Sequence, residues 1–301
     1  MILVFGSVNL DLIVPVPALP RPGETVLGGG LRCEPGGKGA NQAVAAARDG
    51  ASVVFAGAVG QDAFAGPATA CLAGAGVDLR RLAALPAATG VAVICVDPSG
   101  RNQIAVAPGA NLAARVDQVA DADLGPGTTL VLQMEVDPGE TALLIDRARA
   151  AGARIVLSLA PPGPLPAETL AAVDVLLVND AEASWLAASL GVAAEAAALH
   201  AALSRPDVIV TRGAAGAEAA TAAGPLRQPA FAVTPRDTTA AGDTFAGVLA
   251  AALDRGATLA GAMRRAAAAA ALACTRVGSQ GSIPDAAETD ALLAAHAFTA
   301  P

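Results

Sequence analysis

The chain has 301 residues, of which 54% are hydrophobic and 15% are charged, and its formal net charge is −8. This length suits one large α/β domain or two smaller ones, and an acidic chain without a cluster of Lys or Arg is not expected to bind nucleic acid. Four scattered cysteines without a C-x-x-C pair predict neither a disulfide framework nor a zinc site, and we interpret them as small buried residues in a reducing compartment.

Short β-branched segments alternate with longer helical segments along most of the chain. We expect strands at residues 2–8, 53–59, 129–133, 154–159, 173–178 and 208–211. We expect helices at residues 41–48, 64–73, 139–151, 180–190 and 193–203. This alternation predicts βαβ units and a mainly parallel sheet that helices cover on both faces.

Two pairs of segments break this alternation and predict a small sheet outside the main domain. Residues 12–16 and 25–33 flank a Pro/Gly turn, and residues 91–96 and 102–107 predict a hairpin around Asp97-Pro98-Ser99-Gly100. An exposed apolar face on this sheet would need a partner. Its expected members are Val14, Val26, Val91, Val93 and Ile104.

Polar residues and glycines gather near the start of the chain. Asn9 and Asp11 end the first expected strand, where α/β sheets bind ligands, although such residues also form turns. The cluster Gly36-Gly37-Lys38-Gly39 then leads into a helix that carries Asn41, without the spacing of a Walker A loop. Lys38 and Asn41 suit a polyhydroxyl ligand; a plain glycine turn before a helix is the alternative.

A second cluster of small residues opens a long alanine-rich helix near residue 240. The amides of Ala240, Ala241 and Gly242 would form an anion site, because the first amides of a helix lack partners and the helix dipole favours negative charge. Asp243 follows in the first turn, where a bound phosphate would repel it. That placement makes sense if Asp243 handles a proton; a simple helix cap is the alternative.

Two further motifs follow expected strands. Asn179 and Glu182 form an N-x-x-E arrangement that also serves as an ordinary helix cap. Thr211 and Gly213, with Gly216 beyond, are small enough to admit a nucleotide or to make a turn between strands.

In order and spacing, these segments resemble the signature regions of the ribokinase-like (PfkB) family of sugar kinases. The resemblance covers nearly the whole chain, and each motif alone is weak. The matching segments are residues 6–11, 22–25, 35–43, 57–66, 108–111, 133–135, 179–182, 211–216, 237–245 and 276–284. The resemblance implies a single domain over residues 1–301: a ribokinase-like three-layer α/β sandwich with a mainly parallel central sheet. A small β-sheet lid would come from residues of about 10–35 and 89–107.

The resemblance implies an ATP-dependent phosphotransferase with an alcohol group as acceptor. The expected reaction phosphorylates the primary hydroxyl of D-ribose to ribose 5-phosphate; a kinase for another sugar or a nucleoside is the alternative, and the scarcity of aromatic residues disfavours nucleosides. A non-catalytic sugar or nucleotide sensor is a rival from another class, against which the presence of Lys38, Gly242 and Asp243 argues.

The resemblance also assigns roles to single residues. Asp243 is implied as the catalytic base, and Ala240, Ala241 and Gly242 as the anion hole. The implied sugar-binding residues are Asn9, Asp11, Gly37, Lys38, Asn41, Glu135 and Asp243. The implied nucleotide-binding residues are Asn179, Glu182, Thr211, Gly213, Gly216 and Gly242, with Glu182 also holding Mg²⁺ through water.

A potassium site, a partner and a compartment complete the expectations. The resemblance places a K⁺ loop at Asp237, Thr239, Ala273, Arg276, Gly278 and Ser282, and implies a homodimer through the lid. No signal peptide is evident and no apolar run is long enough to span a bilayer, so we expect a cytoplasmic protein without a membrane partner. Departures from the family pattern at Asp180, Arg212 and residues 158–161 bear on the substrate more than on the reaction.

Overall fold

A computed structural model describes residues 1–296, and within them nine strands form one sheet in the order β13-β12-β11-β10-β9-β8-β1-β4-β5. The strands β11, β10, β9, β8, β1, β4 and β5, in their order within the sheet, are all parallel to their neighbours. At one edge, β12 and β13 pair in antiparallel fashion. The strands are β1 (Ile2–Phe5), β4 (Val53–Gly60), β5 (Asp78–Leu85), β8 (Thr129–Leu132), β9 (Arg154–Ser158), β10 (Val175–Asn179), β11 (Asp207–Thr211), β12 (Ala217–Thr221) and β13 (Gly224–Gln228). The predicted mainly parallel sheet is confirmed.

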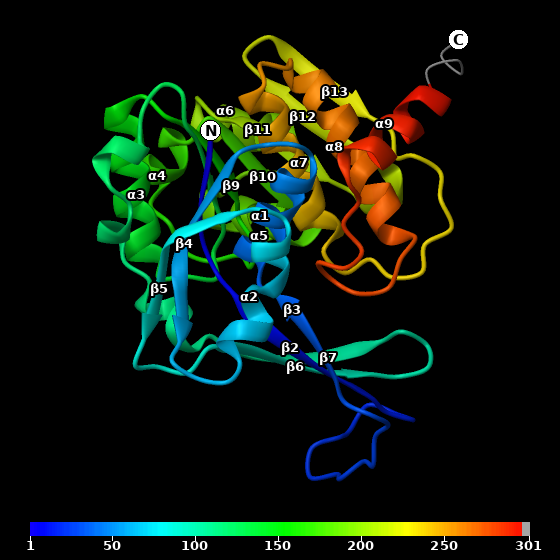
Figure 1. Ribbon diagram of the computed structural model, residues 1–301. Helices are drawn as coiled ribbons and strands as arrows, with labels where there is room; N and C mark the ends of the chain where they lie inside the picture. Colours follow the sequence, from blue (N-terminus) through cyan, green and yellow to red (C-terminus); the bar gives the residue numbers. More distant parts are fainter. Residues whose placement is uncertain (297–301) are drawn as a thin grey trace.

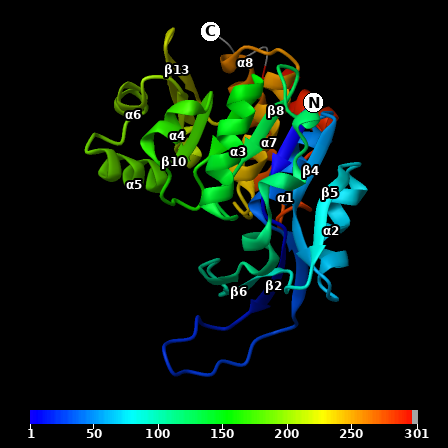
Figure 2. The ribbon, with the colours of Figure 1, turned by 90° about the vertical axis from the view of Figure 1, so that its left-hand side faces the viewer.

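Helices cover both faces of this sheet, which makes a three-layer α/β sandwich (Figures 1 and 2). One layer contains α1 (Lys38–Arg48), α2 (Ala65–Gly74), α7 (Ala241–Asp254) and α8 (Leu259–Cys274), with α9 (Ala286–Ala295) against α8. The other contains α3 (Pro138–Ala151), α4 (Ala167–Ala172), α5 (Asp180–Leu190) and α6 (Ala196–Leu203). Because both faces are covered, β1 is apolar throughout: Ile2 and Val4 face the first layer, Leu3 and Phe5 the second.

The alanine-rich helix α7 is buried from Asp243 to Leu253. Its small side chains let it pack closely between the sheet and the neighbouring helices. At Gly247 a Cβ atom would lie 2.3 Å from the carbonyl oxygen of Gln42, so only glycine allows α1 to approach this closely. This contact sets how closely the middle of α7 lies against α1.

A second, four-stranded sheet projects from one end of the molecule in both ribbon views (Figures 1 and 2). Its order is β3-β2-β6-β7, with β2 (Asn9–Pro15), β3 (Arg32–Gly36), β6 (Gly90–Val96) and β7 (Asn102–Ala107). The hairpin of β6 and β7 matches its prediction. We call this the small sheet.

The structure corrects three details of the predicted small sheet. Residues 25–31 are not a strand, since β3 begins at Arg32. The strand expected at residues 2–8 ends at Phe5, and the chain then crosses to the small sheet, so Asn9 begins β2. Ile104 pairs with Ile94, so Val93 and Ile104 lie on opposite faces rather than on one.

The expected burial of the cysteines is also wrong in part. All four cysteines are free; Cys33 is exposed and the other three are partly buried. Among residues 1–296, none of the helices combines the length and the apolarity that crossing a bilayer requires.

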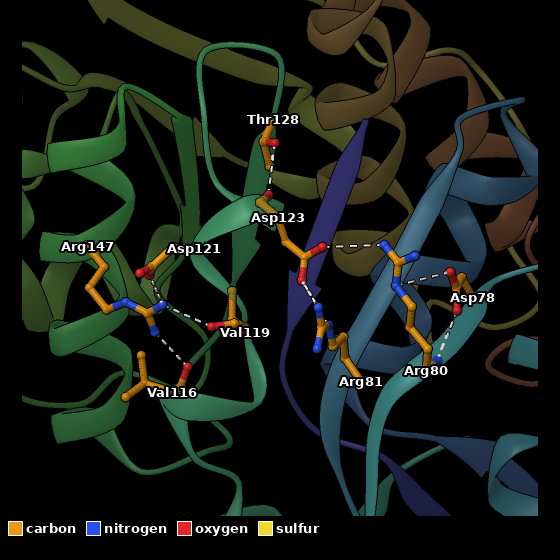
Figure 3. Close-up of polar contacts among 9 residues, drawn as sticks. All are labelled: Asp78, Arg80, Arg81, Val116, Val119, Asp121, Asp123, Thr128 and Arg147. Carbon is orange, nitrogen blue, oxygen red and sulfur yellow. Dashed lines mark hydrogen bonds and ion pairs between the residues drawn. The ribbon is translucent and has the colours of Figure 1, made fainter.

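Charged side chains secure the long connection between the small sheet and β8 (Figure 3). Asp123 is buried and accepts hydrogen bonds from Arg81 (2.8 Å) and Arg80 (3.3 Å) on β5. On the other side, Arg147 of α3 donates to the carbonyl oxygens of Val116 (2.8 Å) and Val119 (2.9 Å). The connection is therefore held between the edge strand and a helix.

Candidate active site

Four of the acidic residues singled out from the sequence act electrostatically on Lys38, the first residue of α1. The carboxylate of Asp243 makes the largest contribution to raising the pKa of Lys38, against the opposing effect of burial. Glu135, Glu182 and Asp11 raise this pKa further. These four carboxylates come from separate segments of the chain, and Glu135 and Glu182 lie just beyond the ends of β8 and β10.

Asp243 is the most constrained of these carboxylates and is only 8% exposed. Its Oδ2 accepts a hydrogen bond from Nδ2 of Asn41 at 2.9 Å, and its Oδ1 accepts one from Nε2 of Gln42 at 3.1 Å. Carboxylate oxygens have about four lone-pair sites in all, so each oxygen can accept another proton or hydrogen bond. The side chain is held firmly and still has the capacity to act as a base.

The backbone before Asp243 has the features of an anion site. Ala240, the N-cap residue of α7, adopts a left-handed conformation with φ of 59°, which is unfavourable for a residue with a Cβ atom. Within residues 1–296, the amides of Ala240, Gly242 and Asp243 donate to no protein acceptor, whereas the amide of Ala241 donates to the carbonyl of Thr238 at 3.2 Å. A Cβ atom at Gly242 would meet nothing within 4 Å, so this backbone is open to a ligand.

The start of α1 depends on Gly37 and Glu135. Gly37 has φ of 91°, and a Cβ atom there would lie 2.8 Å from the amide nitrogen of Asn9. Oε2 of Glu135 accepts hydrogen bonds from the backbone amide of Lys38 (2.9 Å) and from Oγ of Ser7 (2.6 Å). Glu135 therefore supports the helix terminus, while its Oε1 has no such bond among the described residues.

Asp11 lies on β2 opposite Glu34 of β3. Burial raises the pKa of Asp11 from 3.8 to about 7, and the nearby charges of Glu135, Glu34 and Asp243 add to the effect, which Lys38 opposes. Asn9 is held by Asn111, whose Nδ2 donates to its Oδ1 at 2.8 Å. Both residues thus lie on the small sheet, close to the carboxylates of the main domain.

The Asn179 and Glu182 pair forms a capping box at the start of α5. The backbone amide of Asn179 donates to Glu182 at 2.8 Å, and Oδ1 of Asn179 accepts from the amide of Glu182 at 2.9 Å. Burial raises the pKa of Glu182, although these bonds from Asn179 act in the opposite direction. The charges of Lys38 and Asp243 also influence the pKa of Glu182, the former lowering and the latter raising it.

Thr211 pairs with Asn179 at the ends of adjacent parallel strands. Gly213 has open space around it, as an approaching ligand would need. Gly216 has a different explanation, because a Cβ atom there would lie 2.2 Å from the carbonyl oxygen of Gln228. Arg212, the departure noted in the sequence, pairs with Asp180 and Glu218.

The six residues of the expected cation loop come from two segments that the structure joins. Oδ1 of Asp237 accepts from both the amide and the hydroxyl of Thr239, and Oδ2 accepts from the amide of Gly278 at 3.0 Å. Burial raises the pKa of Asp237, but the hydrogen bonds from Thr239 and Gly278 outweigh it and keep this pKa below its ordinary value. The result is a carboxylate held by two backbone amides and one hydroxyl, which join the two segments.

The remaining three residues of that loop differ in what they can offer. Ala273 accepts a bond from the amide of Arg276 at 3.1 Å. The side chain of Arg276 pairs with Glu288, so only its backbone carbonyl could serve a cation. The hydroxyl of Ser282 donates to the carbonyl of Ser279 at 2.7 Å.

Sequence reasoning assigned no role to four residues that hold this site together: Ser7, Gln42, Asn111 and Gln280. Gln280 donates to Oδ1 of Asn41 at 3.1 Å from a position 239 residues away in the chain. Nothing in the local sequence reveals such a contact. Gln42, next to Asn41 near the start of a helix, could have been suspected.

Comparison with known proteins defines the class. Residues 1–286 match the model of the pfkB family of carbohydrate kinases, and the chain belongs to this family. It is therefore a phosphotransferase that acts on a sugar hydroxyl.

The most informative relatives are ribokinases. The chain is 36% identical over 294 residues to ribokinase of Haemophilus influenzae, a match that covers 95% of this chain and 96% of the relative. Ribokinase of Thermotoga maritima superposes with a TM-score of 0.90 at 31% identity, covering 98% of this chain and 99% of that structure. Arabidopsis thaliana ribokinase complexed with ribose and ATP gives a TM-score of 0.85 at 29% identity, covering 97% and 98%.

Proposed function

We propose that the chain transfers the γ-phosphoryl group of ATP to the primary hydroxyl of D-ribose, giving ribose 5-phosphate and ADP. The observation that carries the proposal is the position of Asp243. It is buried, held through both oxygens and directly preceded by backbone amides that have no protein acceptor among the described residues. The similarity to ribokinases over nearly the whole chain supports ribose as the acceptor.

Asp243 would orient the sugar hydroxyl and accept its proton. Phosphoryl transfer needs alignment and charge stabilisation more than covalent chemistry. The amides of Ala240, Gly242 and Asp243 would stabilise the charge on the transferring group. The amide of Ala241 would contribute only if it left the carbonyl of Thr238.

Sugar recognition would come from the residues around Lys38. Asn9 and Asp11 of the small sheet, together with Lys38, Asn41 and Glu135 of the main domain, offer both donors and acceptors to hydroxyl groups. Gly37 would let the backbone approach the sugar. The small sheet would act as a lid that excludes water, which otherwise competes with ribose as the phosphoryl acceptor.

The nucleotide would lie along the ends of β10 and β11, near Asn179, Thr211, Gly213 and Gly216, with its terminal phosphate at Gly242. Mg²⁺, when bound, would offset phosphate charge, and Glu182 suits it through water because the ion prefers hard oxygens and retains part of its hydration. In the described structure Glu182 accepts bonds from Asn179, whose amide could turn to the nucleotide instead.

A monovalent cation fits the loop around Asp237. One charged carboxylate and several backbone carbonyls suit K⁺ better than Mg²⁺, which demands tight octahedral geometry. The candidate set is Asp237, Thr239, Ala273, Arg276, Gly278 and Ser282. Adding K⁺ to cation-stripped enzyme in Tris buffer with saturating MgATP should raise turnover, and Asp237→Ala should remove this response while a low basal rate persists. Equal rates with and without K⁺ would remove the cation site from the proposal.

The experiment for the reaction is ADP release over a panel of pentoses, hexoses and nucleosides, followed by ³¹P NMR of the product. Ribose should give the highest kcat/KM, with phosphate on the primary oxygen. A hexose or nucleoside preferred over ribose would keep the kinase and change the substrate. No ADP release with any acceptor would favour a non-catalytic sensor. We expect the protein to act in the cytoplasm.

A further inference from the structure

Gln42 contacts the candidate base directly, although neither the sequence motifs nor the proposed reaction gives it a role. Its side chain is fully buried, and its Nε2 donates to Oδ1 of Asp243 at 3.1 Å. Asn41 donates to the other oxygen at 2.9 Å. Asp243 is therefore held on both sides by consecutive residues of α1.

The amide groups around Asp243 have a definite direction. Oε1 of Gln42 is buried and accepts no hydrogen bond among residues 1–296, and the same is true of Oε1 of Gln280. A buried acceptor without a partner is unfavourable. The reverse orientation of Gln42 would be worse, because it would place the amide oxygen against a carboxylate oxygen. The donor thus faces Asp243 even though the acceptor goes unused.

Packing fixes Gln42 from the backbone side. The missing Cβ atom of Gly247 lets α7 approach the carbonyl of Gln42, so the two helices meet at this residue. Gln280 fixes the side chain of Asn41, since it donates to Oδ1 of Asn41 (3.1 Å) and thereby turns Nδ2 of Asn41 to Asp243. The carboxylate has little freedom to rotate.

We propose that Gln42 is a positioning residue that fixes the plane of the Asp243 carboxylate so that its remaining lone pairs face the acceptor hydroxyl. The inference rests on the proposed role of Asp243 as the base. A neutral amide suits this task, because it orients the carboxylate with a weaker hydrogen bond than a charged donor would form, and each carboxylate oxygen keeps a lone pair for the acceptor hydroxyl. Small misplacements of a catalytic group can cost on the order of 10²-fold in rate.

The test compares Gln42→Met and Gln42→Glu with Gln118→Met. Gln118 is the control, since its side-chain amide also donates hydrogen bonds, in this case to the carbonyls of Gly57 and Arg81, but lies outside the site. Gln42→Met should lower kcat by about 10- to 100-fold while KM for the sugar and for MgATP stays within about threefold. Gln118→Met should leave kcat unchanged, whatever it does to the melting temperature.

Gln42→Glu keeps the shape of the side chain. Its readout is the kcat–pH profile, which a purely structural role of Gln42 would leave unchanged. The charged groups near Asp243 are Lys38, Asp11 and Glu182, and a new carboxylate in direct contact would oppose ionisation of the pair. The acidic limb of the kcat–pH profile should therefore move to higher pH by about one unit or more, beyond any shift in Gln42→Met.

Two results would overturn the role of Gln42: kcat within about threefold of wild type in both variants, or a kcat loss without a shift of the acidic limb in Gln42→Glu. The kcat of each variant is compared with the kcat of wild type on the acceptor that the wild-type enzyme turns over fastest. The identity of that acceptor tests the proposed function, and the ratios test Gln42, so the two can fail separately.

Discussion

At the scale of single residues, the site combines one lysine with four carboxylates that raise its pKa. Asp11 is strongly affected, since burial and its acidic neighbours raise its pKa from 3.8 to about 7. In the folded chain Asp11 binds a proton more tightly than in the unfolded chain. Between pH 4 and 7, rising pH therefore lowers the contribution of Asp11 to the free energy of unfolding. A residue that would bind substrate thus opposes folding at neutral and alkaline pH.

The variant Asp11→Asn should be more stable than wild type at pH 8, by up to about 4 kcal/mol for a shift of this size. The advantage should shrink as the pH falls from 7 to 4, because the folded wild type takes up a proton at Asp11 in this range while the unfolded chain does so only near pH 4. Urea unfolding of both proteins at pH 4.5, 6 and 8 measures the difference. Sugar affinity should fall in the same variant. A stability difference that does not change with pH would refute the proposed cause.

At the scale of elements, the sequence predicted those strands and helices for which the apolar pattern and the flanking turn residues indicate the same element. The β6–β7 hairpin has both β-branched strands and a Pro-Ser-Gly turn, and it was found where expected. The strands β5, β12 and β13 were missed, because segments such as Ala217–Thr221 are rich in residues that favour helices or turns. Their pairing with neighbouring strands, which no local pattern reports, makes them strands.

The site shows the same division. Asp243 and its amides were predicted from a local pattern, since the start of one helix supplies them all. The contact of Asp243 with Asn41 joins residues 202 positions apart, and Gln42 and Gln280 became visible only through packing. Physical reasoning from the sequence therefore identified the groups that would do chemistry and missed those that hold them.

The close approach of α1 and α7 can be tested at Gly247. Gly247→Ala would place a Cβ atom 2.3 Å from the carbonyl oxygen of Gln42 and 2.7 Å from Cβ of Ala45. The helices must separate, which should cost about 1–3 kcal/mol of stability and reduce kcat by moving Asp243. Gly66→Ala is the control, because nothing lies within 4 Å of its new Cβ atom. It should stabilise α2 by up to about 1 kcal/mol. Thermal unfolding and turnover are measured for both variants. Equal changes in stability and kcat for Gly247→Ala and Gly66→Ala would refute the packing argument.

At the scale of the whole molecule, the small sheet projects from the main body (Figure 1). It carries exposed apolar residues. Ile104 and Val106 on β7 are 55% and 51% exposed. The register of β6 and β2 places them on the same face as Asp11. A second copy of the chain packed on this face would cover the apolar residues and close the sugar site, as expected for the homodimer that the family resemblance implies.

Ile104→Glu should convert this dimer to a monomer, because a charge at the centre of an apolar contact is not compensated. Light scattering after size-exclusion chromatography should give twice the chain mass for wild type and the single mass for the variant. Leu143→Glu is the control, because Leu143 is similarly exposed and belongs to α3, which lies away from the small sheet (Figures 1 and 2). It should leave the mass unchanged. A monomeric wild type would refute the proposed dimer.

The most direct test of the central claim is the turnover of Asp243→Asn with ribose and MgATP, measured together with ribose binding by calorimetry. The amide keeps the shape of the side chain but cannot accept the proton of the sugar hydroxyl, and loss of a general base typically costs about 10²–10⁴-fold in rate. We predict a fall in kcat of that size, with ribose still bound and the melting temperature close to that of wild type. Turnover near the wild-type rate would contradict the account, because Asp243 could then not be the base.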